Sequence, residues 1–548
     1  MTRSRILLVD PNKNVQKAIK AFLEANLSTT VTCVGRQDNA LIELRDGVFD
    51  LVIANSSLSN LPSDQSGIEF LYKLPSNQLK LLITHNREQA LTLPYMQRFT
   101  RSELDPKKFL NKVKETLKTF KLLPASAVKE LAKHARENDL TNLGNKRFKH
   151  TLHSILRLLF PHARKVELKM LTLGRGGSSV VLATPISPNR GTQYIVKLGS
   201  QEMLYKESHN YHQYVEPYAA LRSTTLSGVA YHHDYVALKF LFIGSDRQVK
   251  DDFLKFYHTP DQGNQNLIRV IENIFITTCK LWYESKTDSF SGGLIGRSLI
   301  KCYLDSLNLE SDQRLGFLSE EIATTIESLC QKTMFRRTKI AIQPGGSLLF
   351  HYGRGRIVTL PHPVTFFRAL RYTLPDASYF CITHGDLHED NIFVDNDQAT
   401  WLIDFGRTDE SHALRDVVQF ESVIKFTLLR SRSIIHRIWF EDVLLGQTCL
   451  DSTIDLPESI ANDPIFVRAK DGIETIRLQA AKILEDPSDI DEYFAGLYFN
   501  ALKTLTLKQK RYEDEVGMRV RQTHALYSAA KLSAYFSQVE GSNYHEPE

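Results

Sequence analysis

The sequence has few cysteines, and none of them lies in a spacing typical of metal ligands or disulfide frameworks. Six cysteines occur in 548 residues, and no Cys-x-x-Cys pair is among them. This scarcity argues against a structural zinc site and a disulfide-rich secreted fold, and it fits a reducing compartment. The sequence also lacks an apolar run long enough to span a bilayer, and residues 1–10 lead into a strand-like segment too short for a signal-peptide core. We therefore expect a soluble cytoplasmic protein.

An excess of one charge is also missing. The formal net charge is +5, from 68 Lys and Arg against 63 Asp and Glu, and this small value does not by itself predict nucleic-acid binding. Hydrophobic residues make up 42% of the chain and charged residues 24%, as in folded proteins. A chain of this length exceeds one ordinary hydrophobic core, so about two to four domains are expected.

The first 120 residues alternate between short apolar runs and helical patterns. The apolar runs predict strands over residues 6–9, 31–34, 51–54 and 80–84, and the helical patterns cover residues 14–25, 39–45, 68–72 and 107–119. Such alternation predicts a flavodoxin-like, doubly wound α/β domain with helices on both faces of a parallel sheet. Because many unrelated domains share this layout, the pattern alone does not identify the family.

This stretch resembles a response-regulator receiver domain, whose working residues can be compared one at a time. Such domains carry two adjacent acidic residues after the first strand, where this chain has Asp10 followed by a proline, and an acceptor aspartate after the third strand, where it has Asn55. An amide is a poor nucleophile and brings no charge to a metal ion, so the resemblance implies a receiver that is not phosphorylated. Thr84 matches the switch hydroxyl, whereas Arg101 stands where a lysine is expected. We interpret residues 1–121 as a degenerate receiver, used for docking, self-association or autoregulation.

A helical linker is expected over residues 122–165, with helices over residues 121–140 and 146–159. Lysines and arginines are frequent here, and a basic amphipathic run can bind a membrane or nucleic acid. A solvated face of the linker helices is the commoner explanation, and we favour it.

The segment that runs from Tyr379 to Gly406 carries the most specific pattern in the chain. Residues 380–382 predict a strand, a polar loop follows, and residues 392–394 and 400–403 predict a hairpin around a turn-rich connection. The strands would hold the polar positions between them in a fixed relation.

Three of these polar positions suit a reaction of a metal-bound phosphate. An Asn amide and an Asp carboxylate, here Asn391 and Asp404, offer the hard oxygen ligands that Mg²⁺ prefers while leaving room for ATP phosphates. Asp386, a few residues upstream, would orient an attacking hydroxyl and accept its proton. The alternative is a hairpin in which Asp, Asn and Gly serve only as turn formers.

The motif His-Gly-Asp-Leu-His with Asn391, followed by Asp-Phe-Gly at residues 404–406, resembles the catalytic segment of the aminoglycoside phosphotransferase and choline kinase-like enzymes. The resemblance implies a bilobal protein-kinase-like fold of the α+β class and an ATP-dependent phosphotransferase that uses Mg²⁺. It also implies that Asp386, Asn391 and Asp404 form the catalytic set and that Asn391 and Asp404 bind the metal ion.

Upstream residues fit the nucleotide-binding lobe of the same fold, which we place at residues 166–246. Gly174, Gly176, Gly177 and Ser178 form a glycine-rich turn between two predicted strands, where backbone amides can approach phosphates. The next predicted strand contains Lys197, which the resemblance implies would contact the ATP phosphates.

A helix carboxylate would hold this lysine in place. Glu207 is the expected partner, and Glu202 and Glu216 remain alternatives.

Residues 247–548 are expected to form the C-lobe, with a β-rich insertion near residues 336–360. Three short β-like runs separated by glycine-containing turns predict this insertion, and most of the remaining segments read as helices. Only a short connection separates Asp404 from Asp416, which resembles small-molecule phosphotransferases more than protein kinases; there, an aspartate at the position of Asp416 often braces the catalytic loop.

The sequence therefore predicts a kinase that transfers the γ-phosphoryl group of ATP to a hydroxyl of a small-molecule acceptor. Two alternatives stay open, namely a nucleotide-binding signalling scaffold without activity and a protein kinase in a signalling system. A protein partner, or self-association through the degenerate receiver, is possible under each of them.

Overall fold

The computed structural model of the chain divides into two compact units, each described here by itself. Unit 1 comprises Met1–Tyr205 and Thr225–Phe242, and unit 2 comprises Lys206–Thr224 and Ile243–Glu548. The structure describes residues 4–46, 49–59, 65–74, 79–84, 96–100, 105–117, 121–123, 145–160, 163, 165–173, 178–186, 191–218, 224–232, 235–241, 251–259, 263–288, 299–306, 312–331, 338–353, 355–369, 374, 377–510 and 512–543.

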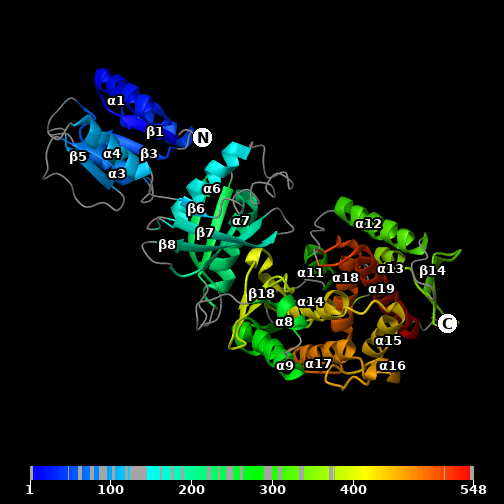
Figure 1. Cartoon of the computed structure of the whole chain (residues 1–548). Helices are drawn as coiled ribbons and strands as arrows, with labels where there is room; N and C mark the ends of the chain where they lie inside the picture. The colour runs from blue at the N-terminus through cyan, green and yellow to red at the C-terminus, as the bar shows by residue number, and fades with distance from the viewer. Residues whose placement is uncertain are drawn as a thin grey trace. The chain divides into compact units, whose positions relative to one another are not determined.

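The first element of unit 1 is a five-stranded parallel sheet in the order β2-β1-β3-β4-β5 (Figure 1). Its strands are β1 (Ser4–Val9), β2 (Thr29–Val34), β3 (Leu51–Asn55), β4 (Lys80–Thr84) and β5 (Met96–Thr100), and its helices are α1 (Lys13–Asn26), α2 (Gln37–Asp46), α3 (Ser66–Lys73) and α4 (Pro106–Leu117). This strand order is that of flavodoxin-like folds. The predicted receiver-like fold class is thus confirmed.

The strand β5 was missed because it lacks an apolar run. Its sequence is MQRFT, and it lies at one edge of the sheet. Edge strands tolerate polar side chains, so hydrophobic patterning does not reveal them.

The central strands each carry a continuous apolar run because helices cover both faces of the sheet. Side chains of β1 alternate between two hydrophobic cores. Ile6 and Leu8 pack with residues of α1 and α4, whereas Leu7 and Val9 pack with residues of α2 and α3. All four side chains are fully buried, and β1 therefore contributes to the hydrophobic cores on both faces of the sheet.

The second sheet of unit 1 has six strands in the order β10-β11-β9-β8-β7-β6. These are β6 (Lys121–Leu123), β7 (Lys165–Leu173), β8 (Ser179–Ile186), β9 (Tyr194–Ser200), β10 (Thr225–His232) and β11 (Tyr235–Leu241). The pair β6–β7 is parallel, and every other neighbouring pair is antiparallel. This sheet is the N-lobe of the kinase-like fold.

The segment predicted as a linker takes part in this sheet. Residues 121–123 form strand β6 rather than the start of a helix, because they pair with β7, a contact that local propensity cannot reveal. The rest of that predicted helix lies outside the described residues. The second predicted helix is present as α6 (Asn145–Leu159), and its residues Ile155 and Leu156 pack into the core of the sheet with Val196.

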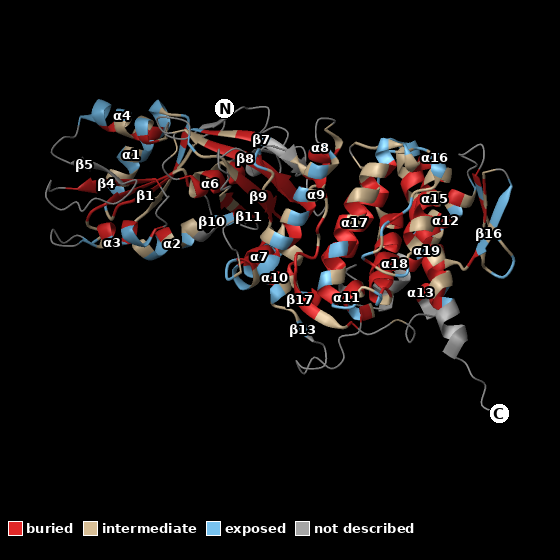
Figure 2. Cartoon of the chain, turned by 90° about the horizontal axis from the view of Figure 1, so that it is seen from below, coloured by how far each residue is buried: buried red, intermediate tan, exposed pale blue. Residues whose placement is uncertain are grey.

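Unit 2 is mainly helical. Its helices are α8 (Phe253–His258), α9 (Asn264–Glu272), α10 (Lys280–Glu284), α11 (Leu299–Ser306), α12 (Asp312–Gln331), α13 (Pro363–Ala369), α14 (Arg415–Ser422), α15 (Ile434–Leu445), α16 (Glu458–Ala461), α17 (Pro464–Leu484), α18 (Asp491–Thr506) and α19 (Glu515–Asn543), and α7 (Gln201–Asn210) crosses the boundary between the units. Figure 2 shows that α18 is buried along most of its length. The prediction that most of this region is helical is confirmed.

Three small antiparallel sheets complete unit 2. They consist of β12 (Asp251–Asp252), β18 (Ile392–Val394) and β19 (Thr400–Leu402); of β13 (Thr287–Asp288), β17 (Tyr379–Thr383) and β20 (Asp409–His412); and of β14 (Thr338–Ile342), β15 (Leu348–Tyr352) and β16 (Arg356–Leu360). The predicted hairpin around the candidate site is β18–β19. The predicted β-rich insertion is β14–β16, and Phe350 of β15 packs against Tyr527 of α19.

The second part of the chain therefore has the predicted bilobal kinase-like fold. None of the helices that the structure describes combines the length and the hydropathy needed to cross a membrane, and the six cysteines form no disulfide.

A cluster of fully buried charges joins four helical segments of unit 2. Arg477 of α17 donates to both carboxylate oxygens of Glu421 of α14, at 2.8 and 2.9 Å. Glu441 of α15 accepts from Lys425 at 2.8 Å and from His524 of α19 at 2.9 Å. Removing one partner from such a buried network leaves an uncompensated charge, which is strongly destabilising.

The buried imidazole of His524 makes the free energy of unfolding depend on pH. Burial lowers its pKa to about 4, although the neighbouring Glu441 opposes the shift, from an ordinary value of 6.5. Between these values the unfolded chain takes up a proton that the folded chain does not, so the free energy of unfolding falls as pH decreases. Lys425 and Arg437, which also face this ring, disfavour its protonated form.

We expect urea denaturation to show lower stability at pH 5 than at pH 7. The contribution of His524 is on the order of 1–2 kcal/mol, so His524→Gln should reduce the pH-dependent loss by that amount. The variant His351→Gln, on β15, should keep the slope of the wild-type protein. A slope unchanged by His524→Gln would contradict this assignment.

Candidate active site

The candidate catalytic loop joins β17 to β18 and begins with a backbone conformation that only glycine adopts easily. Gly385 has a φ of +76°. A Cβ atom at this position would lie 2.2 Å from the carbonyl oxygen of Arg407. The glycine of the His-Gly-Asp motif is therefore required by the close passage of two backbone segments.

Asp416 of α14 binds the backbone at the start of this loop. Its carboxylate accepts from the backbone N–H of His384 at 2.7 Å and of Gly385 at 2.8 Å. Asp416 and His384 are fully buried. The ring Nε2 of His384 donates to the carbonyl oxygen of Ile403 at 3.0 Å, so the histidine links the loop to the end of the hairpin and has a bracing position.

The carboxylate of Asp386 is surrounded by donors. Gln419 of α14 donates from Nε2 to its Oδ1 at 3.2 Å. Lys503 of α18 places Nζ 3.6 Å from the same oxygen. His388 places Nε2 3.8 Å from Oδ2. The side chain of Asp386 is 25% exposed, so a substrate hydroxyl can reach it.

These neighbours decide the ionisation state of Asp386. Burial by itself would raise the pKa of this carboxyl group. Lys503, His388 and Arg407, together with the hydrogen bond from Gln419, outweigh that effect and hold the pKa well below its ordinary value. Asp386 is therefore a carboxylate at neutral pH, able to orient a hydroxyl but weak as a base.

Asn391 is tied to the same loop through its amide nitrogen. Its Nδ2 donates to the carbonyl oxygen of Asp386 at 2.9 Å, and the side chain is 5% exposed. Because the nitrogen is used in this way, the amide oxygen is the atom left to face a cation. One loop thus carries the candidate catalytic carboxylate and a candidate metal ligand.

Asp404 follows β19 in a left-handed conformation, with φ at +71°. A non-glycine residue in this region is uncommon, and such positions concentrate at functional sites. A Cβ atom at Gly406 would lie 3.6 Å from Oδ1 of Asp404. The donor set of Asn391 and Asp404, one amide oxygen and one carboxylate, fits Mg²⁺ chemically.

Glu207 lies close to this segment in unit 2. Its side chain is 1% exposed, and its Cβ would be 3.9 Å from a Cβ built at Gly406. The alternatives Glu202 and Glu216 are exposed, and Glu216 contacts His212 at 2.7 Å. Burial beside the Asp-Phe-Gly segment therefore favours Glu207.

The predicted nucleotide contacts lie in unit 1. Lys197 is buried in β9, opposite Val180 of β8 and Leu238 of β11. Ser178 is also buried, whereas the glycines at positions 174, 176 and 177 lie outside the described residues. Since Lys197 and Glu207 belong to different units, their pairing stays a prediction.

Several residues that contact the loop from distant elements were not predicted from the sequence. Asn210 of α7 donates to the carbonyl oxygens of Phe405 and Gly406 at 3.3 and 3.2 Å. Gln419 and Lys503 also reach Asp386 from distant helices. Lys503 has one sequence signal, because it is the only lysine or arginine in the largely apolar helix α18.

A cavity of about 290 Å³ lies beside the loop but does not include Asp386. Its lining residues are Tyr214, Lys301, Cys302, Asp409, Glu410, Ser411 and Arg415. Arg415 connects the cavity to the loop, because it donates to Asp409 Oδ1 at 2.6 Å and to the carbonyl oxygen of Gly385 at 3.3 Å.

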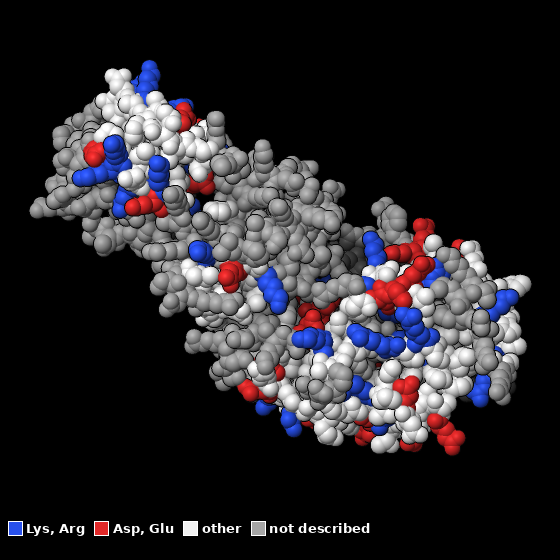
Figure 3. All heavy atoms as spheres, in the orientation of Figure 1, with Lys and Arg blue, Asp and Glu red and all other residues white. Residues whose placement is uncertain are grey.

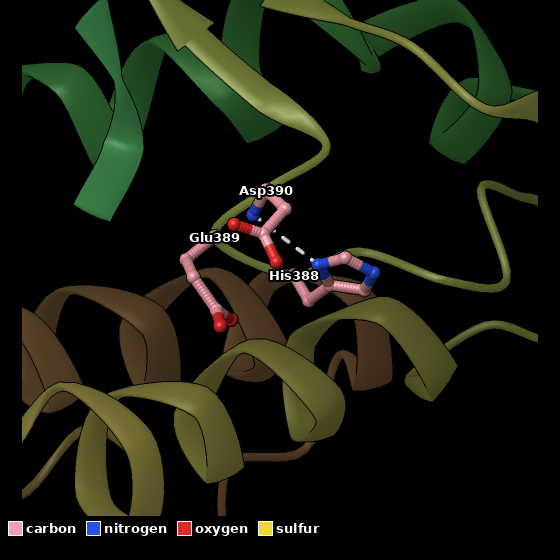
Figure 4. A group of neighbouring side chains, drawn as sticks. All are labelled: His388, Glu389 and Asp390. Atoms are coloured by element: carbon pink, nitrogen blue, oxygen red, sulfur yellow. Dashed lines mark hydrogen bonds between the residues drawn. The ribbon is translucent and has the colours of Figure 1, made fainter. Parts of the chain in front are cut away.

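Three consecutive residues of the loop form a second possible cation site. Ligand atoms of His388, Glu389 and Asp390 lie within 4.8 Å of one another. Figure 4 shows Glu389 directed toward the helices beneath the loop, away from the ring of His388. Glu389 is already bound by Lys510 and Tyr512, so this triplet is a weaker candidate than Asn391 with Asp404.

In the receiver-like sheet, the residues at the positions compared with receiver domains contact each other. Asn55, at the end of β3, donates from Nδ2 to Oδ2 of Asp10 at 3.2 Å, and both residues are buried. Thr84 is fully buried at the end of β4, and Arg101 lies outside the described residues. The two side chains thus satisfy each other through this hydrogen bond.

Comparisons with known proteins agree in part with this description. The model of a family described as "ternary complex associated domain 9" matches residues 163–297 and 353–506, more than half of the chain. These ranges include every candidate site residue of the kinase-like domain. Most of the β14–β16 insertion falls outside them. No curated protein matches the sequence.

Solved structures with similar folds include a CheY-like receiver domain from Methanospirillum hungatei JF-1, with 23% identity, a TM-score of 0.19, and coverage of 21% of this chain and 94% of that chain. An aminoglycoside phosphotransferase matches with 11% identity, a TM-score of 0.33, and coverage of 72% and 99%. A choline kinase from Cryptosporidium parvum Iowa II matches with 10% identity, a TM-score of 0.31, and coverage of 69% and 91%. At these scores the likenesses carry no weight for function.

The contact between Asp10 and Asn55 leads to a prediction for the receiver-like domain. Asn55→Asp would place two carboxylates about as close as the present hydrogen bond, and their repulsion should lower stability when no divalent cation is present. We expect a lower thermal midpoint than wild type in EDTA and a recovery in Mg²⁺. Asn26→Asp adds the same charge at the exposed end of α1 and removes a hydrogen bond to the carbonyl oxygen of Phe22, so it should lower the midpoint equally in EDTA and in Mg²⁺, with no recovery. An Asn55→Asp variant whose stability does not respond to Mg²⁺ would contradict the interpretation that the receiver-like domain has lost a cation site.

Proposed function

The chain belongs to the ternary complex associated domain 9 family, and we propose that its kinase-like domain is an ATP- and Mg²⁺-dependent phosphotransferase. It would transfer the γ-phosphoryl group of ATP to a hydroxyl of a small-molecule acceptor. The observation that carries this proposal is the arrangement around Asp386. An ionised, partly exposed carboxylate and the metal-ligand candidate Asn391 are fixed in one loop by hydrogen bonds.

Each residue then has a defined task. Asp386 would orient the acceptor hydroxyl in line with the γ-phosphoryl group and take its proton as the new bond forms. Asn391 and Asp404 would hold Mg²⁺, which supplies charge neutralisation for the ATP phosphates when bound. Lys197 would contact the phosphates, Glu207 would position Lys197, and the glycine-rich turn with Ser178 would cover the phosphates. Alignment and charge, rather than base strength, would supply most of the rate.

The connection after the Asp-Phe-Gly segment favours a small acceptor. β20 begins at Asp409, and α14 begins at Arg415. β20 pairs with β17, so this stretch is committed to a sheet. It offers little chain for the longer segment that binds peptides in protein kinases.

The receiver-like domain would have a separate task. We propose docking, self-association or autoregulation without phosphorylation, because Asn55 replaces the acceptor.

Figure 3 shows basic and acidic side chains interspersed on the visible face of the described residues, and this face therefore offers no support for a nucleic-acid partner.

Substitution of Asp386 tests the proposal. Asn391 binds the main-chain carbonyl of residue 386 rather than its side chain, so Asp386→Ala should leave the metal ligands in place. We expect Mg²⁺-dependent ATP binding to persist and phosphoryl transfer, measured with γ-³²P-labelled ATP and a metabolite extract, to fall by about 10²- to 10⁴-fold.

The matched control is Asp397→Ala, which removes an exposed aspartate from the neighbouring β18–β19 turn. This variant should transfer phosphate at the wild-type rate. Transfer that survives in Asp386→Ala would refute the assigned mechanism. ATP binding without transfer in the wild-type protein would favour the alternative of a nucleotide-binding scaffold.

A further inference from the structure

The side chains around Asp386 indicate the charge of the acceptor. The side chains placed around this carboxylate are the amide of Gln419, the ammonium group of Lys503 and the imidazole of His388. Arg407 adds a further positive charge that acts on the same carboxylate. An acceptor that presents its hydroxyl to Asp386 therefore has to lie against cations and hydrogen-bond donors.

Three of the carboxylates close to the loop are engaged by other groups. Glu389 is bound by Lys510 and Tyr512. Asp416 accepts from two backbone N–H groups, and Asp409 accepts from Arg415. These three carboxylates are committed to the protein and are not arranged to receive an ammonium group of a ligand.

Burial of the Lys503 side chain lowers the stability of the fold, which argues that its charge has a function. Lys503 lies near the end of α18, between the buried residues Leu502 and Thr504. Its side chain is only 23% exposed. Burying most of a lysine side chain costs solvation energy that a surface position would avoid.

We infer that the acceptor carries an anionic group, a phosphate monoester or a carboxylate, next to the hydroxyl that is phosphorylated, and that Lys503 binds this group. The inference rests on the proposed phosphotransferase function and narrows its substrate class. A cationic acceptor such as an amino alcohol or an aminosugar would bring its ammonium groups toward Lys503 and Arg407, where like charges repel. In the reaction, the acceptor oxygen bonds to the γ-phosphorus, the bond from that phosphorus to the β,γ-bridging oxygen breaks, ADP leaves, and Asp386 takes the hydroxyl proton.

Separation of acceptors by charge tests the inference on the full-length protein. A small-molecule extract is divided by ion exchange into an anionic and a cationic fraction, and each is incubated with the protein, Mg²⁺ and γ-³²P-labelled ATP. We expect labelled product from the anionic fraction. Acid phosphatase treatment of that fraction beforehand distinguishes the two anions, since it removes phosphate monoesters and leaves carboxylates.

The outcomes separate this inference from the proposed function. Labelled product from the cationic fraction would overturn the inference while leaving the phosphotransferase function intact. Absence of product from both fractions, with Mg²⁺-dependent ATP binding retained, would overturn both. Absence of ATP binding would show that the proposed function itself has failed.

Variants of Lys503 give a second, independent readout. With the active fraction as acceptor, Lys503→Gln should raise the KM for the acceptor by about 10- to 100-fold, the value of a charge-assisted hydrogen bond, while the KM for ATP stays near that of wild type. Lys503→Glu should lower transfer further, and Lys503→Arg should restore most of it. A role limited to folding would instead change thermal stability without moving the KM for the acceptor.

The matched control is Lys508→Glu. Lys508 lies five residues further along the chain and is exposed, so the same charge reversal should leave both KM values unchanged. Equal effects of Lys503→Glu and Lys508→Glu would show that only the overall charge of this region matters, which would overturn the assignment to Lys503.

Discussion

The geometry of the candidate site depends on one buried carboxylate. Asp416 accepts the backbone N–H groups of His384 and Gly385, and this pair of hydrogen bonds fixes the start of the catalytic loop. The left-handed conformation of Gly385 then lets the loop pass against the backbone of Arg407. From this fixed start, Asp386 projects toward Gln419 and Lys503, and Asn391 returns to bind the carbonyl oxygen of Asp386. Without the brace, the candidate catalytic and metal-binding groups would lose their common frame.

The two halves of the chain treat a pair of polar residues in opposite ways. In the receiver-like domain, an amide and a carboxylate satisfy each other, since Asn55 donates to Asp10. In the kinase-like domain, the amide nitrogen of Asn391 donates to the backbone, and we propose that its oxygen and the carboxylate of Asp404 bind a cation. This contrast agrees with the proposal of a catalytic kinase-like domain and a receiver-like domain used for docking, self-association or autoregulation.

Local patterns allowed much of the fold and part of the site to be predicted. The strands β1–β4, the hairpin β18–β19 and the insertion β14–β16 follow from short apolar runs bounded by turn residues, and Asp386, Asn391 and Asp404 lie within one contiguous stretch. The contacts that the sequence did not reveal are long-range. Lys503 reaches Asp386 from a helix more than one hundred residues away, and Asn210 reaches the Asp-Phe-Gly segment from α7. The strand β6 was predicted as helix because its only reason to be extended is its pairing with β7.

The central claim is that Asn391 and Asp404 hold Mg²⁺ for ATP, and calorimetric titration of the purified full-length chain with ATP tests it most directly. The titration is done in Mg²⁺ and in EDTA, for the wild-type protein and for Asp404→Asn. The account predicts that Mg²⁺ tightens ATP binding to the wild-type protein and that Asp404→Asn removes most of this gain. ATP affinity that is the same with and without Mg²⁺, or a gain that survives in Asp404→Asn, would contradict it.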